Sequence, residues 1–122
     1  MLSNYEKGIN AESKVTNILI NSGYEILGNR VRTKYGEIDI LAFKDNTVIA
    51  VEVKQRKTLN IARECLTSRQ MHRISKALQL IISQRNVLNE FENYRIDVVF
   101  LDRTGNYEYI INAFSFETDN DM

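Results

Sequence analysis

The chain has 122 residues, 43% hydrophobic and 26% charged, a composition typical of one globular domain. No apolar run approaches the roughly 18 residues of a membrane-spanning helix, no signal-peptide pattern is seen, and the single Cys65 excludes an internal disulfide, which fits a reducing cytoplasm. The net charge is zero, but residues 30–85 carry 12 Lys and Arg against 5 Asp and Glu, whereas residues 86–122 carry 2 against 8. A basic middle region suits a polyanionic ligand.

The N-terminal two thirds of the chain predict two helices and three strands. Apolar residues at helical spacing predict a helix over residues 5–22, which Gly23 ends. β-type residues follow over 24–33. The turn 44–46 separates two apolar runs, which predicts a hairpin of strands near 37–43 and 47–54. Residues 55–66 are expected to form a loop, and Thr67 or Ser68 can cap a second helix over 68–85.

The C-terminal part predicts the last two strands of the same sheet. Apolar runs over residues 95–101 and 107–114 flank a turn at 104–106, and the polar residues 115–122 are expected to form a frayed tail. The order α-β-β-β-α-β-β predicts a single domain over residues 1–122. Its class is α/β or α+β, with a mixed sheet flanked by helices.

Charged residues interrupt the apolar strands of the predicted hairpin. Because side chains alternate along a strand, Glu37 and Asp39 share one face, and Glu52 and Lys54 share one face of the neighbouring strand. The opposite, apolar face would pack against a helix. One interpretation is a solvent-exposed face with a Glu52–Lys54 salt bridge. The other is a hard-cation site, where Asp39 and Glu52 bind Mg²⁺ and Lys54 lies beside an attacking water or the charged transition state.

Further charged residues flank this group. Glu12 lies at the edge of the apolar stripe of the first helix, so it either joins the site or reaches solvent or an arginine. Two basic runs lie before and after the hairpin, and they either contact phosphates or form a solvated surface; their members are Arg30, Arg32, Lys34, Arg56 and Lys57. The second helix carries Arg69, Arg73 and Lys76, which we expect on its outer face.

Two further polar residues are assigned structural or surface roles. His72 is expected on the surface, because no second His or Cys lies at metal-ligand spacing. Asp97 interrupts a strand but is expected to be structural, paired with Arg95 or a helix cap.

The arrangement of Asp39, twelve intervening residues and Glu52-Val53-Lys54 resembles the D…(D/E)-x-K signature of restriction-endonuclease-like nucleases. The chain from Gly8 to about Phe114 resembles, more specifically, the YraN family of small bacterial proteins. The motifs that carry this resemblance are Gly8-x-x-x-Glu12, Gly36-Glu37-Ile38-Asp39, Val51-Glu52-Val53-Lys54 with Arg56, the Thr67-led helix, Arg95-Ile96-Asp97-Val98-Val99 and Asn112-Ala113-Phe114. The G-x-x-x-E, G-E-x-D and E-V-K elements also occur in archaeal Holliday-junction resolvases.

The resemblance implies a restriction-endonuclease-like fold and a divalent-metal-dependent nuclease that hydrolyses phosphodiester bonds of DNA, branched DNA included. It implies a catalytic set of Glu12, Asp39, Glu52 and Lys54. The acidic members and the Val53 main-chain carbonyl would bind Mg²⁺ or Mn²⁺, and Glu37 would support the fold. Analogy with the resolvases implies a homodimer.

The sequence departs from the family pattern at two places. Arg30-Val31-Arg32 stands where the family has Asn, an aromatic and a basic residue, and Gln70 stands where the family has Lys. Neither departure removes an implied metal ligand. Two other functions stay open: a nucleic-acid-binding module that uses the nuclease scaffold without cutting, and a purely structural or assembly role.

Overall fold

The structure is a computed structural model that describes residues 3–85 and 93–114, so the predicted tail 115–122 lies outside the described residues. Its helices and strands, in chain order, are α1 (Asn4–Asn21), β1 (Glu25–Thr33), β2 (Gly36–Lys44), β3 (Thr47–Gln55), α2 (Leu59–Glu64), α3 (Ser68–Arg85), β4 (Asn93–Leu101) and β5 (Tyr107–Ile110). None of the helices in the described ranges is both long and apolar enough to cross a membrane.

Local sequence signals set the boundaries of these elements. Ser3 accepts a hydrogen bond from the Glu6 N–H, and the Glu6 carboxylate accepts one from the Ser3 N–H, so α1 begins with a capping box. Gly23 follows the helix with φ +90°, as predicted. At the hairpin, Asp45 and Asn46 both have positive φ, 49° and 59°, which suits a tight two-residue turn.

The five strands form one mixed sheet in the order β1-β2-β3-β4-β5. The pairs β1–β2, β2–β3 and β4–β5 are antiparallel, whereas β3 and β4 are parallel. A parallel pair needs a long crossover, and α2 and α3 provide it. The predicted class and the order α-β-β-β-α-β-β are thus confirmed.

Two local predictions are wrong. Helix α2 lies within the predicted loop 55–66, because the Thr58 side chain accepts a hydrogen bond from the Ile61 N–H and begins a short helix. Strand β5 ends at Ile110, short of the predicted 114, because Asn112 has φ 56°, a left-handed conformation that does not continue a strand.

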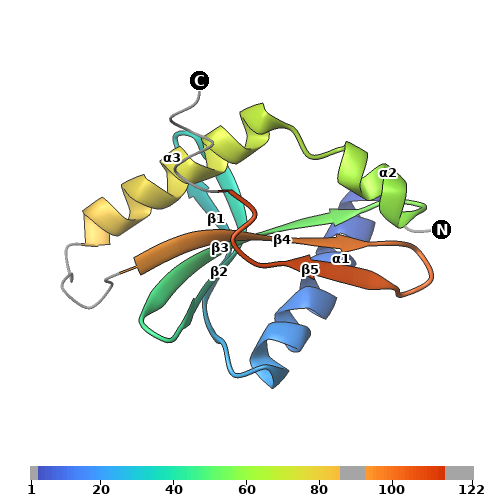
Figure 1. The fold of residues 1–122 in the computed structure, drawn as a ribbon, viewed down its shortest axis with the longest axis horizontal. Coiled ribbons are helices and arrows are strands. Elements are labelled where there is room, and N and C mark those ends of the chain that lie inside the picture. The colour runs from blue at the N-terminus through green and yellow to red at the C-terminus, as the bar shows by residue number, and fades with distance from the viewer. Residues whose placement is uncertain (1–2, 86–92, 115–122) are drawn as a thin grey trace.

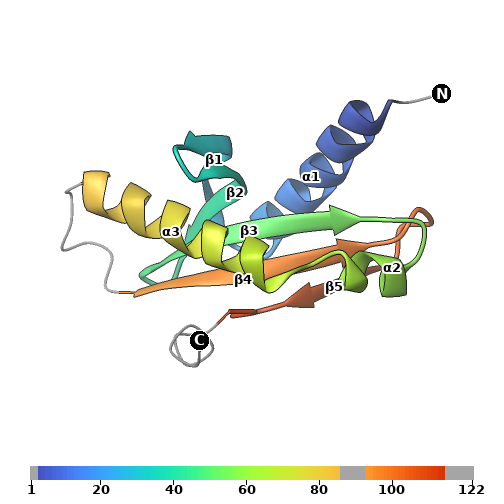
Figure 2. The same ribbon diagram turned by 90° about the horizontal axis from the view of Figure 1, so that it is seen from above.

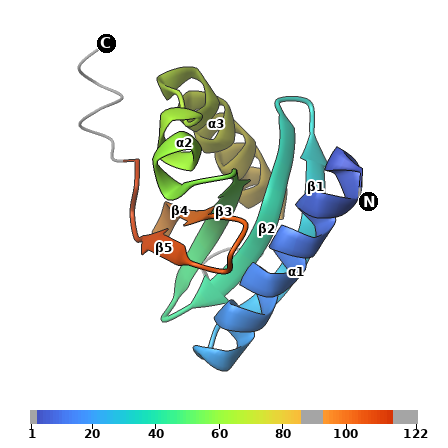
Figure 3. The same cartoon turned by 90° about the vertical axis from the view of Figure 1, so that its right-hand side faces the viewer.

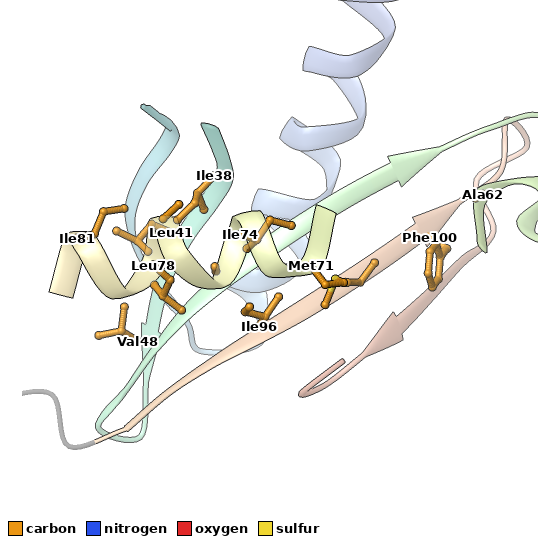
Figure 4. Packing of buried hydrophobic residues seen from close by; sticks show 13 residues of the cluster. Ile38, Leu41, Val48, Ala62, Met71, Ile74, Leu78, Ile81, Ile96 and Phe100 are labelled. Atoms are coloured by element: carbon orange, nitrogen blue, oxygen red, sulfur yellow. The ribbon is translucent and has the colours of Figure 1, made fainter. Parts of the chain in front are cut away.

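Helices cover both faces of the sheet, α1 on one side and α2 and α3 on the other (Figures 1 and 3). On the first face, α1 buries Val15 and Leu19 against a cluster that includes Ile40, Ile49 and Val51. On the other face, α3 buries its apolar side against the second cluster (Figure 4), whose members include Leu41, Val48, Ile74, Leu78 and Ile96. The expected packing of an apolar hairpin face against a helix is confirmed, but the opposite face is apolar and covered as well. Glu37, Asp39, Glu52 and Lys54 lie near the start of β2 and the end of β3.

Candidate active site

The site lies where β2 and β3 separate. Their antiparallel ladder runs from Lys44 paired with Thr47 to Ile40 paired with Val51, and stops there. Beyond that point the Val53 N–H donates to Asp39 Oδ2 at 2.9 Å, so a carboxylate takes the place of a strand carbonyl. Ile38 and Ile40 pack in different cores, although residues two apart share a face in a regular strand. The backbone therefore turns at Asp39.

Glu52 is buried beside Asp39, with 5% of its surface exposed. Its Oε2 lies 3.9 Å from Lys54 Nζ and 3.7 Å from Arg73 Nη2. Burial is the main cause that raises the pKa of Glu52 to about 9, and a hydrogen bond and repulsion from the Asp39 carboxyl add to it. Lys54 and Arg73 oppose the rise without cancelling it. The Glu52–Lys54 pairing is therefore observed, but its expected exposure to solvent is wrong.

Glu12 approaches the same carboxylates from α1. It is 8% exposed, and its Oε2 lies 3.0 Å from Arg30 Nη2. Burial raises the pKa of Glu12 to about 7, with further contributions from the negative charges of Asp39 and Glu37. Of the alternatives for this residue, pairing with an arginine is observed, and exposure to solvent is wrong. Glu12 and Asp39 both line the cavity described below.

Arg73 is a site residue that the sequence interpretation missed. Instead of facing outward from α3, its Nη1 donates to the main-chain oxygens of Tyr35, at 3.3 Å, and Glu37, at 3.1 Å. Gly36 lies between them with φ +115°, and a Cβ there would overlap Arg73 Nη1. Arg73 thus connects the β1–β2 turn to Glu52. One available signal was the position of Arg73 one helical turn before the fully buried Ala77.

Of the predicted basic residues before the hairpin, Arg30 pairs within the site, whereas Arg32 and Lys34 are exposed. Arg30, besides its contact with Glu12, lies 3.7 Å from Glu37, and Arg32 lies 3.9 Å from the same carboxylate. The Lys34 ammonium lies 5.3 Å from the centre of the Tyr35 ring. After the hairpin, Arg56 and Lys57 are exposed, and Arg56 Nη1 donates to the Gln55 carbonyl at 2.7 Å.

A cavity of about 510 Å³ opens beside this group on the α1 side of the sheet. Its lining comprises Lys7, Gly8, Ala11, Glu12, Arg30, Asp39, Val53, Gln55, Arg56 and Arg103. Glu52 and Lys54 are not among them, because side chains alternate and that of Val53 faces α1. Asp39, where the strands separate, therefore lies between two groups of site residues. Glu12 is on one side of the sheet, and Glu52 and Lys54 are on the other. Lys7 and Arg103 were not predicted.

The predicted metal ligands do not form a preformed metal-binding site. Within residues 3–85 and 93–114, no group of three His, Cys, Asp or Glu side chains is arranged to hold a cation. Glu12 and Asp39 line one cavity, whereas Glu52 is not part of that lining. Metal binding therefore stays a prediction.

Two other sequence interpretations are tested by the structure. Asp97 is fully buried, and its oxygens accept hydrogen bonds from Arg95 at 3.0 Å, the Tyr109 hydroxyl at 2.6 Å and the Asn112 N–H at 2.9 Å. Its structural role is confirmed. His72 is half-buried and packs edge-on against the Phe114 ring, 5.1 Å between centroids, so it lies only partly on the surface.

Known proteins share this sequence over most of its length. Residues 11–101 match the model of the family described as uncharacterised protein family UPF0102. A UPF0102 protein of Granulibacter bethesdensis is 38% identical over 92% of this chain and 70% of its own length. A UPF0102 protein of Sulfurihydrogenibium sp. is 37% identical over 92% of this chain and 96% of its own length. The chain therefore belongs to the UPF0102 family, which is the YraN family that its motifs resemble.

Proposed function

We propose that this protein is a divalent-metal-dependent nuclease that hydrolyses phosphodiester bonds of DNA. The observation that carries the proposal is the position of Asp39 between two buried acidic residues, Glu12 and Glu52, where β2 and β3 separate beside a cation-lined cavity. This arrangement does little to stabilise the fold, because the acidic groups repel one another and are removed from water.

The residues fit a hard cation. Carboxylate and carbonyl oxygens are the ligands that Mg²⁺ and Mn²⁺ prefer, and Mg²⁺ commonly takes only one or two carboxylates and retains several waters. Asp39 and Glu52 form such a pair. Glu12 Oε2 is a buried atom that accepts no hydrogen bond from the described residues, its contact with Arg30 being ionic in geometry. It can therefore receive one from a bound water. Asp39 and Glu52, with Glu12 and the Val53 carbonyl, would hold the ion.

The remaining residues have distinct roles in hydrolysis. Water attacks the phosphorus, the bond to one ester oxygen breaks, and the leaving oxygen gains a proton. A bound divalent cation supplies Lewis acidity and lowers the pKa of its water. The Lys54 ammonium, 3.9 Å from Glu52, stabilises the charge that develops on the phosphate. Arg73 holds Glu52 and the β1–β2 turn in place.

Calorimetry combined with a cleavage screen tests this function. Mg²⁺ and Mn²⁺ are titrated into the wild type and into an Asp39→Asn/Glu52→Gln variant, which keeps side-chain shape but removes both carboxyl groups as metal ligands. The same samples are then incubated with single-stranded, duplex, flapped and four-way DNA, and with RNA. We expect metal binding and cleavage in the wild type and neither in the variant.

Equal and negligible metal binding in both proteins, with no cleavage of any substrate, would contradict the proposed nuclease function. DNA affinity that requires no metal and survives Asp39→Ala would instead identify a binding module on this scaffold. The cavity and its cations favour that second function as well, so the cleavage result decides between them.

A further inference from the structure

The cations around the cavity belong to two groups with different partners. Arg30 lies inside the site, paired with Glu12 and Glu37. Lys7, Arg56 and Arg103 also line the cavity, and within the described residues none of these three forms an ion pair with a carboxylate. Their positive charges are therefore available to an anion that enters from solvent.

The three residues come from separate parts of the fold. Lys7 lies in the N-terminal half of α1, Arg56 follows β3, and Arg103 lies in the turn between β4 and β5. Figures 1 and 2 show that these segments lie at the same end of the molecule. The Arg56 N–H also donates to the Leu101 carbonyl at 3.1 Å, which connects the end of β3 to the end of β4. We call Lys7, Arg56 and Arg103 the cationic rim.

Small residues leave the cavity open below the rim. Gly8 and Ala11 form the α1 part of its wall. Gly8 lies one helical turn before Glu12 on the same face, and Nη2 of Arg30, which lies 3.0 Å from Glu12, would be 3.7 Å from a Cβ at Gly8. A phosphate chain that passes the rim would meet Arg30 and Asp39, which line the same cavity. The β1 residues differ, because the exposed Arg32 pairs with Glu37.

We propose that Lys7, Arg56 and Arg103 bind the nucleic-acid backbone, contacting phosphates next to the one that is cut. The inference rests on the proposed function and assigns its substrate path to the end of the sheet near α1, past Arg30 in the cavity lining and away from the exposed Arg32 and Lys34. Such contacts position a backbone without reading its bases. The ligand class is a polymeric phosphodiester, because three separated cations match successive phosphates better than a single small anion.

Binding measured without catalysis tests the rim. The full chain is titrated against fluorescently labelled single-stranded and duplex oligonucleotides in EDTA, by anisotropy, over a series of salt concentrations. The test variant is Lys7→Gln/Arg103→Gln. The control is Arg32→Gln/Lys34→Gln, which removes the same net charge from the basic run. Thermal melts establish that both variants fold.

We expect the test variant to reduce the slope of log affinity against log salt by about 1.8 on duplex or about 1.4 on single strands, since each lost phosphate contact removes about 0.9 or 0.7. The control should leave the slope unchanged. The proposal is overturned if both variants lose the same amount of slope, or if the test variant loses none. It is also overturned if the wild type does not bind the oligonucleotides. Cleavage by the wild type is scored separately, so a cutting enzyme with an unaltered test variant overturns the rim alone.

Discussion

Two groups of buried carboxylates in this small domain differ in how fully they are compensated. Asp97 on β4 is 0% exposed, and its two oxygens accept hydrogen bonds from a guanidinium, a phenol and a main-chain N–H. Glu52 on β3 is 5% exposed, yet its nearest cations lie 3.7 and 3.9 Å away and its pKa is raised to about 9. The first group stabilises the fold. The second is costly in the absence of a ligand, which is typical of a functional site.

Removal of Asp97 should have the largest effect. Asp97→Ala would leave Arg95 and the Tyr109 hydroxyl without their buried acceptor, so we expect a loss of about 3–5 kcal/mol in the free energy of unfolding. Urea denaturation measures it. Glu52→Ala is the matched control, because it also truncates a buried acidic side chain on a strand. An equal loss in both variants would end the distinction between the two groups.

Glu52→Gln should stabilise the protein in a pH-dependent way. Because the pKa of Glu52 is about 9 in the folded chain and 4.5 ordinarily, the unfolded chain releases this proton first as the pH rises. Wild-type stability therefore falls between about pH 5 and pH 9. In EDTA, the variant should match the wild type near pH 4 and exceed it by about 1–3 kcal/mol near pH 8. Parallel stability profiles for the two proteins would contradict this.

The contact between Arg73 and Gly36 should show non-additive effects. Arg73→Ala removes hydrogen bonds to two main-chain oxygens, for an expected loss of about 1–3 kcal/mol. Gly36→Ala should cost a similar amount, about 1–3 kcal/mol, from its φ of +115° and the overlap with Arg73. The double variant should lose less than the sum, because the overlap is then gone. Strict additivity in a denaturation cycle would mean that the two residues act separately.

The exposed pair in the basic run should have the smallest effect. Arg32 lies 3.9 Å from Glu37 with 86% of its side chain exposed, so Arg32→Gln should change stability by less than about 0.5 kcal/mol. The same denaturation assay measures it. A loss comparable to that of Arg73→Ala would show that the β1 arginines are part of the site's support.

The sequence predicted the sheet well because its signals are local. The Asp45-Asn46 turn, the Gly23 stop and the apolar runs each act within a few residues, and the observed elements follow them. Thr67 also caps α3 as predicted, its hydroxyl accepting from the Gln70 N–H at 3.2 Å. Helix α2 was missed because one threonine cap begins it, with little apolar periodicity to mark it.

The candidate site was only partly predictable, because its geometry depends on contacts distant in sequence. The proximity of Glu12 to Asp39 requires α1 to pack across the sheet, and the role of Arg73 requires α3 to meet the β1–β2 turn. The burial of Glu52 depends on the helices that cover both sheet faces. Lys7 and Arg103 join one cavity from nearly opposite ends of the chain, and no spacing pattern links them.

The hydrogen bond from the Val53 N–H to Asp39 makes one backbone amide a natural reporter. Its proton points at a carboxylate oxygen, so its ¹H–¹⁵N resonance should move when a cation or a proton changes the charge on that oxygen. Ala50 and Val51 pair within the regular β2–β3 ladder and provide internal references in the same strand. Occupancy of the site can thus be followed by NMR in the native protein, residue by residue, before any substrate is known.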